Sequence, residues 1–258
     1  MVYGTVANGL LLPLWGTTLG AALVLFMKRE LRQSVQKALT GFAAGVMLAA
    51  TVWSLLIPAI EQSERLGRLA ALPAILGICC GVGALLALDR FMPLAQTVVT
   101  FSKRIPSQTR TTVLAIVLHN IPEGMAVGVV YAAWLTGQPG VTRAVALSLV
   151  LGIAIQNFPE GAIVSMPLHG GGVAKGKAFA CGAASGLVEP AAGLVTVLAA
   201  RFIAAVLPYL LGFSAGAMIY AVLMELVPEM TAGAHARLAA VWFTAGFILM
   251  MFLDVALG

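Results

Sequence analysis

Long apolar stretches separated by short polar joints make up almost the whole chain. A helix needs about 20 apolar residues to cross the hydrocarbon core of a bilayer. The pattern therefore predicts eight transmembrane helices, at approximately 6–27, 38–60, 70–93, 111–133, 144–166, 177–200, 204–228 and 236–257. These helices leave no room for a sizeable soluble part, so we expect an all-α, polytopic membrane protein with a single transmembrane domain over residues 1–258. The first stretch lacks the basic segment and cleavage site of a signal peptide, and we expect it to be retained.

The composition also indicates a bilayer environment. The 258 residues are 60% hydrophobic and only 10% charged, with a mean hydropathy of +1.00, whereas soluble domains are about 25% charged. A chain this apolar cannot present a wetted surface on all sides. The three cysteines, Cys79, Cys80 and Cys181, lie inside apolar stretches, and we interpret them as small buried side chains. Thiolate ligation of a metal is the weaker alternative.

The basic residues predict the orientation of the helices, because short cytoplasmic joints carry an excess of Lys and Arg. The first, third, fifth and seventh joints hold eleven basic residues: Lys28, Arg29, Arg32, Lys37, Arg90, Lys103, Arg104, Arg110, Lys175, Lys177 and Arg237. The other joints hold four: Arg65, Arg68, Arg143 and Arg201. We therefore expect a multi-pass protein of the cell membrane (the inner membrane in a Gram-negative bacterium) with both termini outside. No aromatic and basic platform accompanies the net charge of +5, so we expect no nucleic-acid partner.

Two internal repeats indicate that the chain has an inverted symmetry. The segment GFAAGVMLAA (41–50) resembles GFSAGAMIYA (212–221), and HNIPEG (119–124) resembles QNFPEG (156–161). In the predicted topology the two members of each pair run in opposite directions. Transporters with such inverted repeats bind their substrate near the middle of the membrane. Chance similarity between helices rich in Gly and Ala is the alternative for the first pair.

Acidic residues inside the predicted spans are the strongest functional signal. Those in the spans are Glu123, Glu160, Glu189 and Glu225, with Asp89 and Asp254 nearer helix ends. A carboxylate at the centre of a bilayer costs about 2.5–3.5 kcal/mol on insertion scales. No Lys or Arg is expected at a matching depth, so a bound cation would compensate several carboxylates at once. Protonated or fully hydrogen-bonded carboxyl groups are the alternative.

Two predicted helices repeat one pattern, a glutamate with polar side chains three and four residues before it. The two sets are His119, Asn120 and Glu123, and Gln156, Asn157 and Glu160. This spacing puts each set on one face of its helix. Imidazole, amide and carboxylate groups suit Zn²⁺ and its first-row neighbours. Each glutamate could then bridge two ions.

A proline stands beside each of these glutamates. Pro122 and Pro159 lack a backbone N–H, so the carbonyls of Leu118 and Ile155 lose their helical partner. We expect a kink at these points, with carbonyl oxygens turned towards a cavity. Pro190 follows Glu189 and predicts a third broken point at a similar depth. A kink that serves packing alone is the alternative.

These motifs resemble the signature motifs of the ZIP (zinc/iron-regulated transporter-like) family of metal transporters. The Gln–Asn version resembles the GufA-like branch, and the similarity extends to ASGLVEP and the closing MMFLDVALG. The resemblance implies eight helices in a 3+2+3 inverted-repeat bundle with both termini outside. It implies import of a divalent metal into the cytoplasm, with zinc first and Cd, Fe and Mn as further options, and no prosthetic group. It also implies a binuclear site between helices two, four, five and six.

The resemblance assigns metal ligands by position. One ion would be held by His119, Glu123, Gln156, Glu160 and Met47. The other would be held by Asn120, Glu123, Asn157, Glu160 and Glu189. The pathway would further include Met224 and Glu225 on the seventh helix and Asp89 at an entrance or exit.

The chain departs from the family pattern in two places. Gln156 and Asn157 stand where many members have His and an acidic residue, which leaves the charge and occupancy of the second metal position open. The loop between the third and fourth helices contains no histidine, so we expect no metal-collecting role there.

Three other functions remain open from the residues. An intramembrane metalloenzyme would need an open ligand position and a general base, but the HExxH motif is absent and we expect no enzyme. A channel or efflux path for Mg²⁺ or Mn²⁺ would favour all-oxygen ligands, which His119 argues against. A metal sensor or structural membrane protein would show no flux. The expected partners are the metal ion and the lipid bilayer, and a homodimer remains open.

Overall fold

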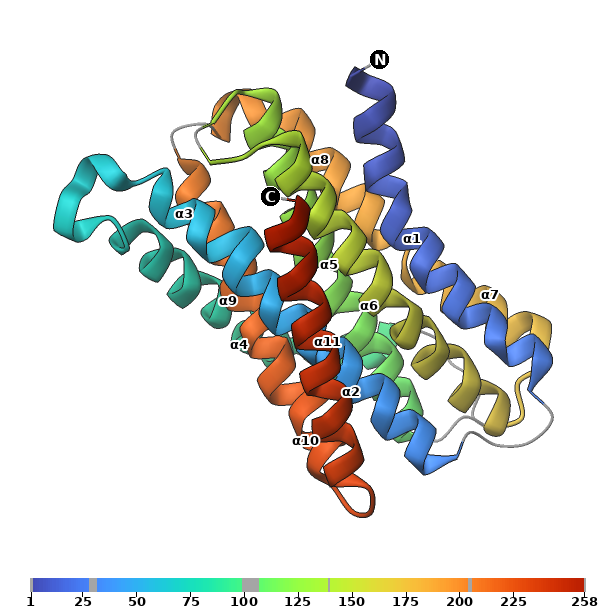
Figure 1. Cartoon of the computed structure of the whole chain (residues 1–258). Coiled ribbons are helices and arrows are strands. Elements are labelled where there is room, and N and C mark those ends of the chain that lie inside the picture. The colour runs from blue at the N-terminus through green and yellow to red at the C-terminus, as the bar shows by residue number, and fades with distance from the viewer. Residues whose placement is uncertain (1, 28–31, 99–106, 139, 204–205, 258) are drawn as a thin grey trace.

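The computed structural model describes residues 2–27, 32–98, 107–138, 140–203 and 206–257, for some helical residues the backbone only. Within these ranges every regular element is a helix (Figure 1). Six stretches of the described part are long and apolar enough to cross a membrane: Gly4–Phe26, Gln33–Glu61, Arg143–Gly170, Lys175–Ala199, Leu207–Thr231 and Ala236–Ala256. The prediction of an all-helical, polytopic membrane protein is therefore confirmed.

The helices follow one another with short connections. In chain order they are α1 (Val2–Phe26), α2 (Gln33–Ala50), η1 (Thr51–Leu56), α3 (Ile57–Glu61), η2 (Glu64–Leu69), α4 (Leu72–Val98), α5 (Ser107–Leu135), α6 (Arg143–Gly170), α7 (Lys175–Ser185), α8 (Val188–Ile203), α9 (Leu207–Ala221), η4 (Val222–Leu226), α10 (Val227–Thr231) and α11 (Ala236–Leu257). A helix lies within each residue range where the apolar pattern predicts a transmembrane span. The predicted joint from Leu94 to Arg110 is shorter than expected, because α4 and α5 both extend into it.

Two of these stretches contain a π turn. The stretch from α2 to α3 passes through η1, and the stretch from α9 to α10 passes through η4. Pro58 and Pro228 follow the two turns, and neither can donate a backbone hydrogen bond. The helix adapts by using longer bonds, and Ile57 donates to the carbonyl of Val52, five residues before it. By contrast, α5 and α6 remain helical through Pro122 and Pro159.

The sixth predicted span, at 177–200, is divided into α7 and α8. The division falls at Gly186, four residues before Pro190, whose missing N–H leaves the Gly186 carbonyl without its usual helical donor. The backbone N–H of Glu189 donates to that carbonyl instead, at 3.2 Å. The broken point expected beside Glu189 is thus present, and it sets this glutamate in the first turn of α8.

Four pairs of helices pack closely: α1 with α6, α5 with α8, α2 with α11, and α4 with α9. A β-carbon at Gly45 of α2 would lie 2.0 Å from the backbone oxygen of Phe243 in α11. One at Gly216 of α9 would lie 2.4 Å from that of Ile78 in α4. Only glycine allows backbones to approach so closely. Gly45 and Gly216 are equivalent positions of the first internal repeat, which therefore makes the same kind of contact twice.

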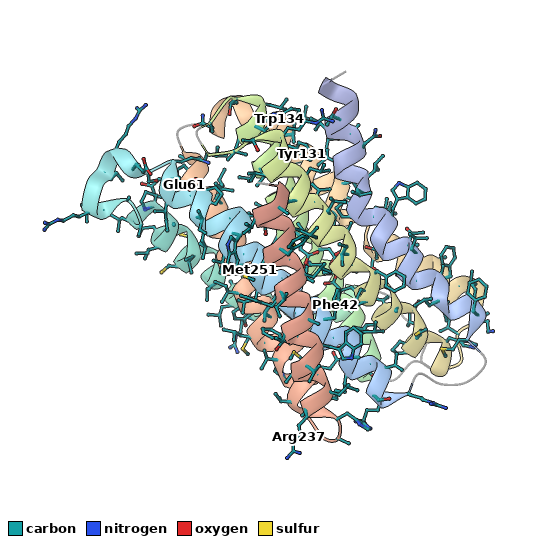
Figure 2. All side chains as sticks on the ribbon, in the orientation of Figure 1. Phe42, Glu61, Tyr131, Trp134, Arg237 and Met251 are labelled. Atoms are coloured by element: carbon teal, nitrogen blue, oxygen red, sulfur yellow. The ribbon has the colours of Figure 1, made fainter. Side chains whose placement is uncertain are left out.

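The helices run between two ends of the molecule. The beginning of α1 and the end of α11 lie in the upper half of Figure 1, whereas the junctions of α6 with α7 and of α10 with α11 lie at the lower end. Figure 2 shows Tyr131 and Trp134 near the upper end and Arg237 at the lower end. The beginning of α1 and the end of α11 therefore lie towards the same end of the bundle.

Apolar side chains occupy both the interior and the outer surface. The main buried cluster includes Met47, Leu149 and Leu211, and large side chains such as Phe252 are exposed, as a lipid-facing surface allows. Cys79, Cys80 and Cys181 are free and exposed. The interpretation of the cysteines as buried is therefore wrong. A small apolar side chain suits lipid as well as a core, so the apolar pattern could not separate these two environments.

Candidate metal-binding site

Three of the glutamates predicted inside spans are buried between the helices. Glu123 on α5 is fully buried, Glu160 on α6 is 3% exposed, and Glu189 on α8 is 2% exposed. The Glu189 carboxylate lies close enough to Glu123 and Glu160 for their charges to act on it. Several carboxylates in a low-dielectric interior repel one another unless protons or cations compensate them.

Amide side chains connect these glutamates across helices. Gln156 on α6 donates a hydrogen bond to Oε1 of Glu123 on α5. Asn157, the next residue of α6, donates to Oε2 of Glu189 on α8 at 2.7 Å. Asn120 on α5 donates to the backbone oxygen of Ser185 at the end of α7, at 3.2 Å. The bond from Gln156 to Glu123 thus joins the two polar sets predicted from the sequence.

The amide oxygens of this network are available to a cation. Asn120, Gln156 and Asn157 are all fully buried. Their side-chain oxygens have no hydrogen-bond partner among the described residues. Buried polar atoms normally have a partner, and an amide oxygen is a suitable ligand for a divalent cation. Three such oxygens beside three carboxylates form an arrangement that would favour a positive ion.

Glycines bring the site helices together. A β-carbon at Gly124, directly after Glu123, would lie 2.2 Å from the backbone oxygen of Glu189. A β-carbon at Gly161, directly after Glu160, would lie 2.0 Å from the backbone oxygen of Thr17 in α1. The glycine that ends each PEG motif therefore lets α8 or α1 pack against the helix that carries the glutamate.

The first helix contributes to the site, which the sequence did not indicate. Thr17 is 1% exposed, and its Oγ1 lies 3.5 Å from Oε1 of Glu189 and 3.3 Å from the backbone oxygen of Pro13. Asn157 also donates to the Pro13 oxygen, at 3.3 Å. No charged or metal-ligating side chain marks this part of α1, so only the packing of α1 against α6 reveals it.

The other candidate ligands have different environments. Met47 on α2 is fully buried within the main apolar cluster, and α2 packs against α6. Met224 is exposed and Glu225 half-buried, both on η4, which packs against α2, α9 and α10. The side chains of His119 on α5 and Asp89 on α4 lie outside the described residues.

Among the described side chains, no group of three or more His, Cys, Asp or Glu residues could hold a metal ion. The side-chain oxygens of Asn120, Gln156 and Asn157, which are buried without a hydrogen-bond partner among the described residues, are further possible ligands. The mixture of amide and carboxylate ligands expected from the two motifs stays a prediction.

A second polar cluster lies where α6, η1 and α11 meet. Asp254 is 8% exposed and accepts hydrogen bonds from Ser54 at 2.6 Å and from Ser148 at 2.8 Å. The sequence identified Asp254 only as an acidic residue near a helix end. The two serines gave no signal, because single serines are common in membrane helices.

Comparisons with known proteins agree with this chemistry. The family model described as "ZIP Zinc transporter" matches residues 103–254. The chain is 36% identical to zinc transporter ZIP11 of Xenopus tropicalis, over 99% of each chain. It is 40% identical to zinc transporter ZIPB of Bordetella bronchiseptica, over 94% of this chain and 78% of that protein. It is 34% identical to zinc transporter GufA of Myxococcus xanthus, over 94% of this chain and 96% of that protein.

Proposed function

Because the chain belongs to the ZIP zinc transporter family, with relatives in its GufA-like branch, we propose that it imports divalent zinc into the cytoplasm through a binuclear site within the membrane. The observation that carries this proposal is the buried network of Glu123, Glu160 and Glu189, in which amide oxygens without a hydrogen-bond partner lie beside carboxylates. Such a set attracts a divalent cation and repels anions.

The ligands divide into two overlapping sets. One ion is held by His119, Glu123, Gln156, Glu160 and Met47. The other is held by Asn120, Glu123, Asn157, Glu160 and Glu189. Glu123 and Glu160 touch both ions in this proposal. The hydrogen bonds from Gln156 to Glu123 and from Asn157 to Glu189 support it, since they join the motif helices α5 and α6 to each other and to α8.

The proposed path also needs an entrance and an exit. Glu225 and Met224 on η4 would line part of it, and Asp89 would stand near one end. The π turn that carries Glu225 supports this assignment, because π turns in helices often occur at functional sites.

The proposed topology has eight spans in a 3+2+3 inverted repeat with both termini outside. The basic joints support the orientation by the positive-inside rule. Two features of the packing support the repeat. In the proposed repeat, the close packing of α2 with α11 is equivalent to that of α9 with α4. The packing of α1 with α6 is likewise equivalent to that of α8 with α5. In each of the two stretches that contain a GFxAG segment, a π turn and then a proline follow that segment.

The proposed cargo is Zn²⁺, with Cd²⁺, Fe²⁺ and Mn²⁺ as ions that the same ligands could accept. The proposed role is transport without catalysis, in the cell membrane and in contact with lipid. A homodimer is compatible with this role. The amide-rich ligand set favours rapid passage, because conduction requires binding that is weak enough to release the ion.

Zinc uptake by the purified protein in liposomes tests the proposal. Glu123→Ala and Glu160→Ala should each abolish uptake while the protein remains inserted, because each removes a ligand shared by both ions. Glu64→Ala changes an exposed glutamate of η2 in the same way and should leave uptake unchanged. Wild-type uptake by Glu123→Ala would eliminate the binuclear site, and wild-type liposomes without zinc flux would eliminate transport. Accumulation of radioactive zinc in intact cells, rather than loss, supports the import direction.

A further inference from the structure

Thr17 lies at the point where α1 meets the metal-binding helices. Its backbone oxygen is the atom that Gly161 of α6 approaches, and a β-carbon at Gly186, between α7 and α8, would lie 2.9 Å from its side chain. The side chain is 1% exposed. Thr17 is therefore held between two glycine backbones, and its hydroxyl cannot turn towards solvent.

The hydroxyl completes a set of donors around Glu189. Asn157 donates to Oε2 of Glu189 at 2.7 Å, and the Thr17 hydroxyl lies 3.5 Å from Oε1. Both donors also reach the backbone oxygen of Pro13, each at 3.3 Å. Each carboxylate oxygen of Glu189 thus has a donor within reach, and the single proton of the Thr17 hydroxyl is shared between Glu189 and the Pro13 carbonyl.

We propose that Thr17 is a positioning residue of the metal site, whose hydroxyl orients the Glu189 carboxylate for the ion. This inference rests on the proposed function, and it makes α1 a part of the site although α1 supplies no metal ligand. A carboxylate with a donor within reach of each oxygen has less freedom to rotate than one held at a single oxygen. The ordering cost is then met before the ion arrives, which strengthens binding.

The expected size follows from metal sites in general. Residues that hydrogen-bond to a metal ligand change metal affinity by about 10- to 100-fold when they are removed. Among the described residues, Thr17 and Asn157 are the side-chain donors within reach of Glu189, and the Thr17 distance is the longer. We therefore expect removal of the hydroxyl to weaken zinc binding by about 10-fold, the lower end of that range.

Two substitutions separate the hydroxyl from the packing of Thr17. Thr17→Val keeps the branched shape between Gly161 and Gly186 but removes the hydroxyl. Thr17→Ser keeps the hydroxyl but removes a methyl group. If orientation of Glu189 is the role of Thr17, Val is harmful and Ser is tolerated. If packing is the role, the order is reversed. Thr196→Val on α8 is the matched control, because Thr196 is also buried and its hydroxyl donates to the backbone oxygen of Ala192 in its own helix.

Zinc binding to the purified full chain, measured by calorimetry in detergent, tests the proposal together with uptake in liposomes. We expect Thr17→Val to weaken binding about 10-fold and to raise the zinc concentration for half-maximal uptake. Thr17→Ser and Thr196→Val should behave as wild type. In a Glu189→Gln background, Thr17→Val should change the affinity less than about 2-fold, because interacting residues are not additive.

Three results would overturn the inference while leaving transport intact: wild-type affinity for Thr17→Val, equal losses for Val and Ser, or an undiminished effect of Thr17→Val in the Glu189→Gln background. A wild-type protein that neither binds nor transports zinc would instead overturn the proposed function itself. The two failures are therefore distinguishable.

Discussion

Replacement of Asn157 by Asp tests how charge is balanced in the site. In the proposed binuclear state, Glu123, Glu160 and Glu189 supply three negative charges against four positive charges from two ions, which leaves a net charge of about +1 in a low-dielectric bundle. An aspartate at position 157 would bring this balance to zero. It would also replace the amide that donates to Glu189 at 2.7 Å with a second carboxylate.

The size of the effect follows from this contact. Two unit charges about 4 Å apart repel by roughly 4 kcal/mol at an effective dielectric constant of 20. Loss of a hydrogen bond to a charged group adds about 1.5–3 kcal/mol. Bound zinc relieves both costs, but a proton can also relieve them in the empty site. We therefore expect that only part of this energy strengthens metal binding. A gain of about 1.4 kcal/mol corresponds to a 10-fold higher affinity for the second ion, and we expect at least that gain.

The measurement is the number of zinc ions per purified protein after equilibrium dialysis, with uptake rates in liposomes alongside. Asn157→Asp should bind more zinc at a given free concentration and have a lower maximal uptake rate, since tighter binding slows release. Asn157→Ala removes the same donor without adding charge and should gain no metal. If Asn157→Asp binds no more zinc than wild type and transports no more slowly, the charge argument is refuted. Asn157 would then be a hydrogen-bonding residue that orients Glu189.

Two further predictions concern packing and topology. Gly45→Ala should lower the free energy of unfolding by about 1–3 kcal/mol, because its β-carbon would lie 2.0 Å from the Phe243 backbone oxygen. Thermal unfolding measures this loss. Gly83→Ala is the control and should be neutral, because no atom lies within 4 Å of its β-carbon. In a variant whose exposed Cys79, Cys80 and Cys181 are replaced by serine, a cysteine at Arg143 should react with an impermeant thiol reagent in intact cells, and one at Lys177 should be protected. The opposite labelling pattern would reverse the proposed import direction.

The positions of the helices could be predicted from the sequence because the bilayer imposes a single rule. Every backbone polar group in lipid needs a partner within the segment, so an apolar stretch of sufficient length must be helical. The break beside Glu189 was also predictable, because Pro190 removes a donor at a fixed distance along the chain. The exposure of the three cysteines was not predictable, because residues on the outer face and on the inner face of a membrane helix are equally apolar.

The candidate site could also be predicted in part, because the bilayer makes charged side chains inside a span unusual. Glu123, Glu160 and Glu189 were visible because carboxylates inside spans are costly and therefore rare. The contribution of Thr17 was not visible, because a threonine costs little in a membrane helix and can bond to its own backbone. The role of the Pro13 carbonyl was equally hidden, since every residue has a carbonyl. Both depend on the contact between α1 and α6, which no local pattern encodes.

The amides of this site do more than replace ligands of a different type. An amide has a donor and an acceptor, so Asn157 can hold Glu189 through its nitrogen while its oxygen remains without a partner in the described residues. A carboxylate at position 157 could only accept, and the empty site would then need a proton or an ion to be stable. The amide instead stabilises the empty site through hydrogen bonds. Compared with an aspartate, the amide therefore leaves less charge repulsion in the empty site for an ion to relieve, and ion binding is weaker by that difference. We infer that Asn157 favours release over retention, as a protein that must let go of each ion requires.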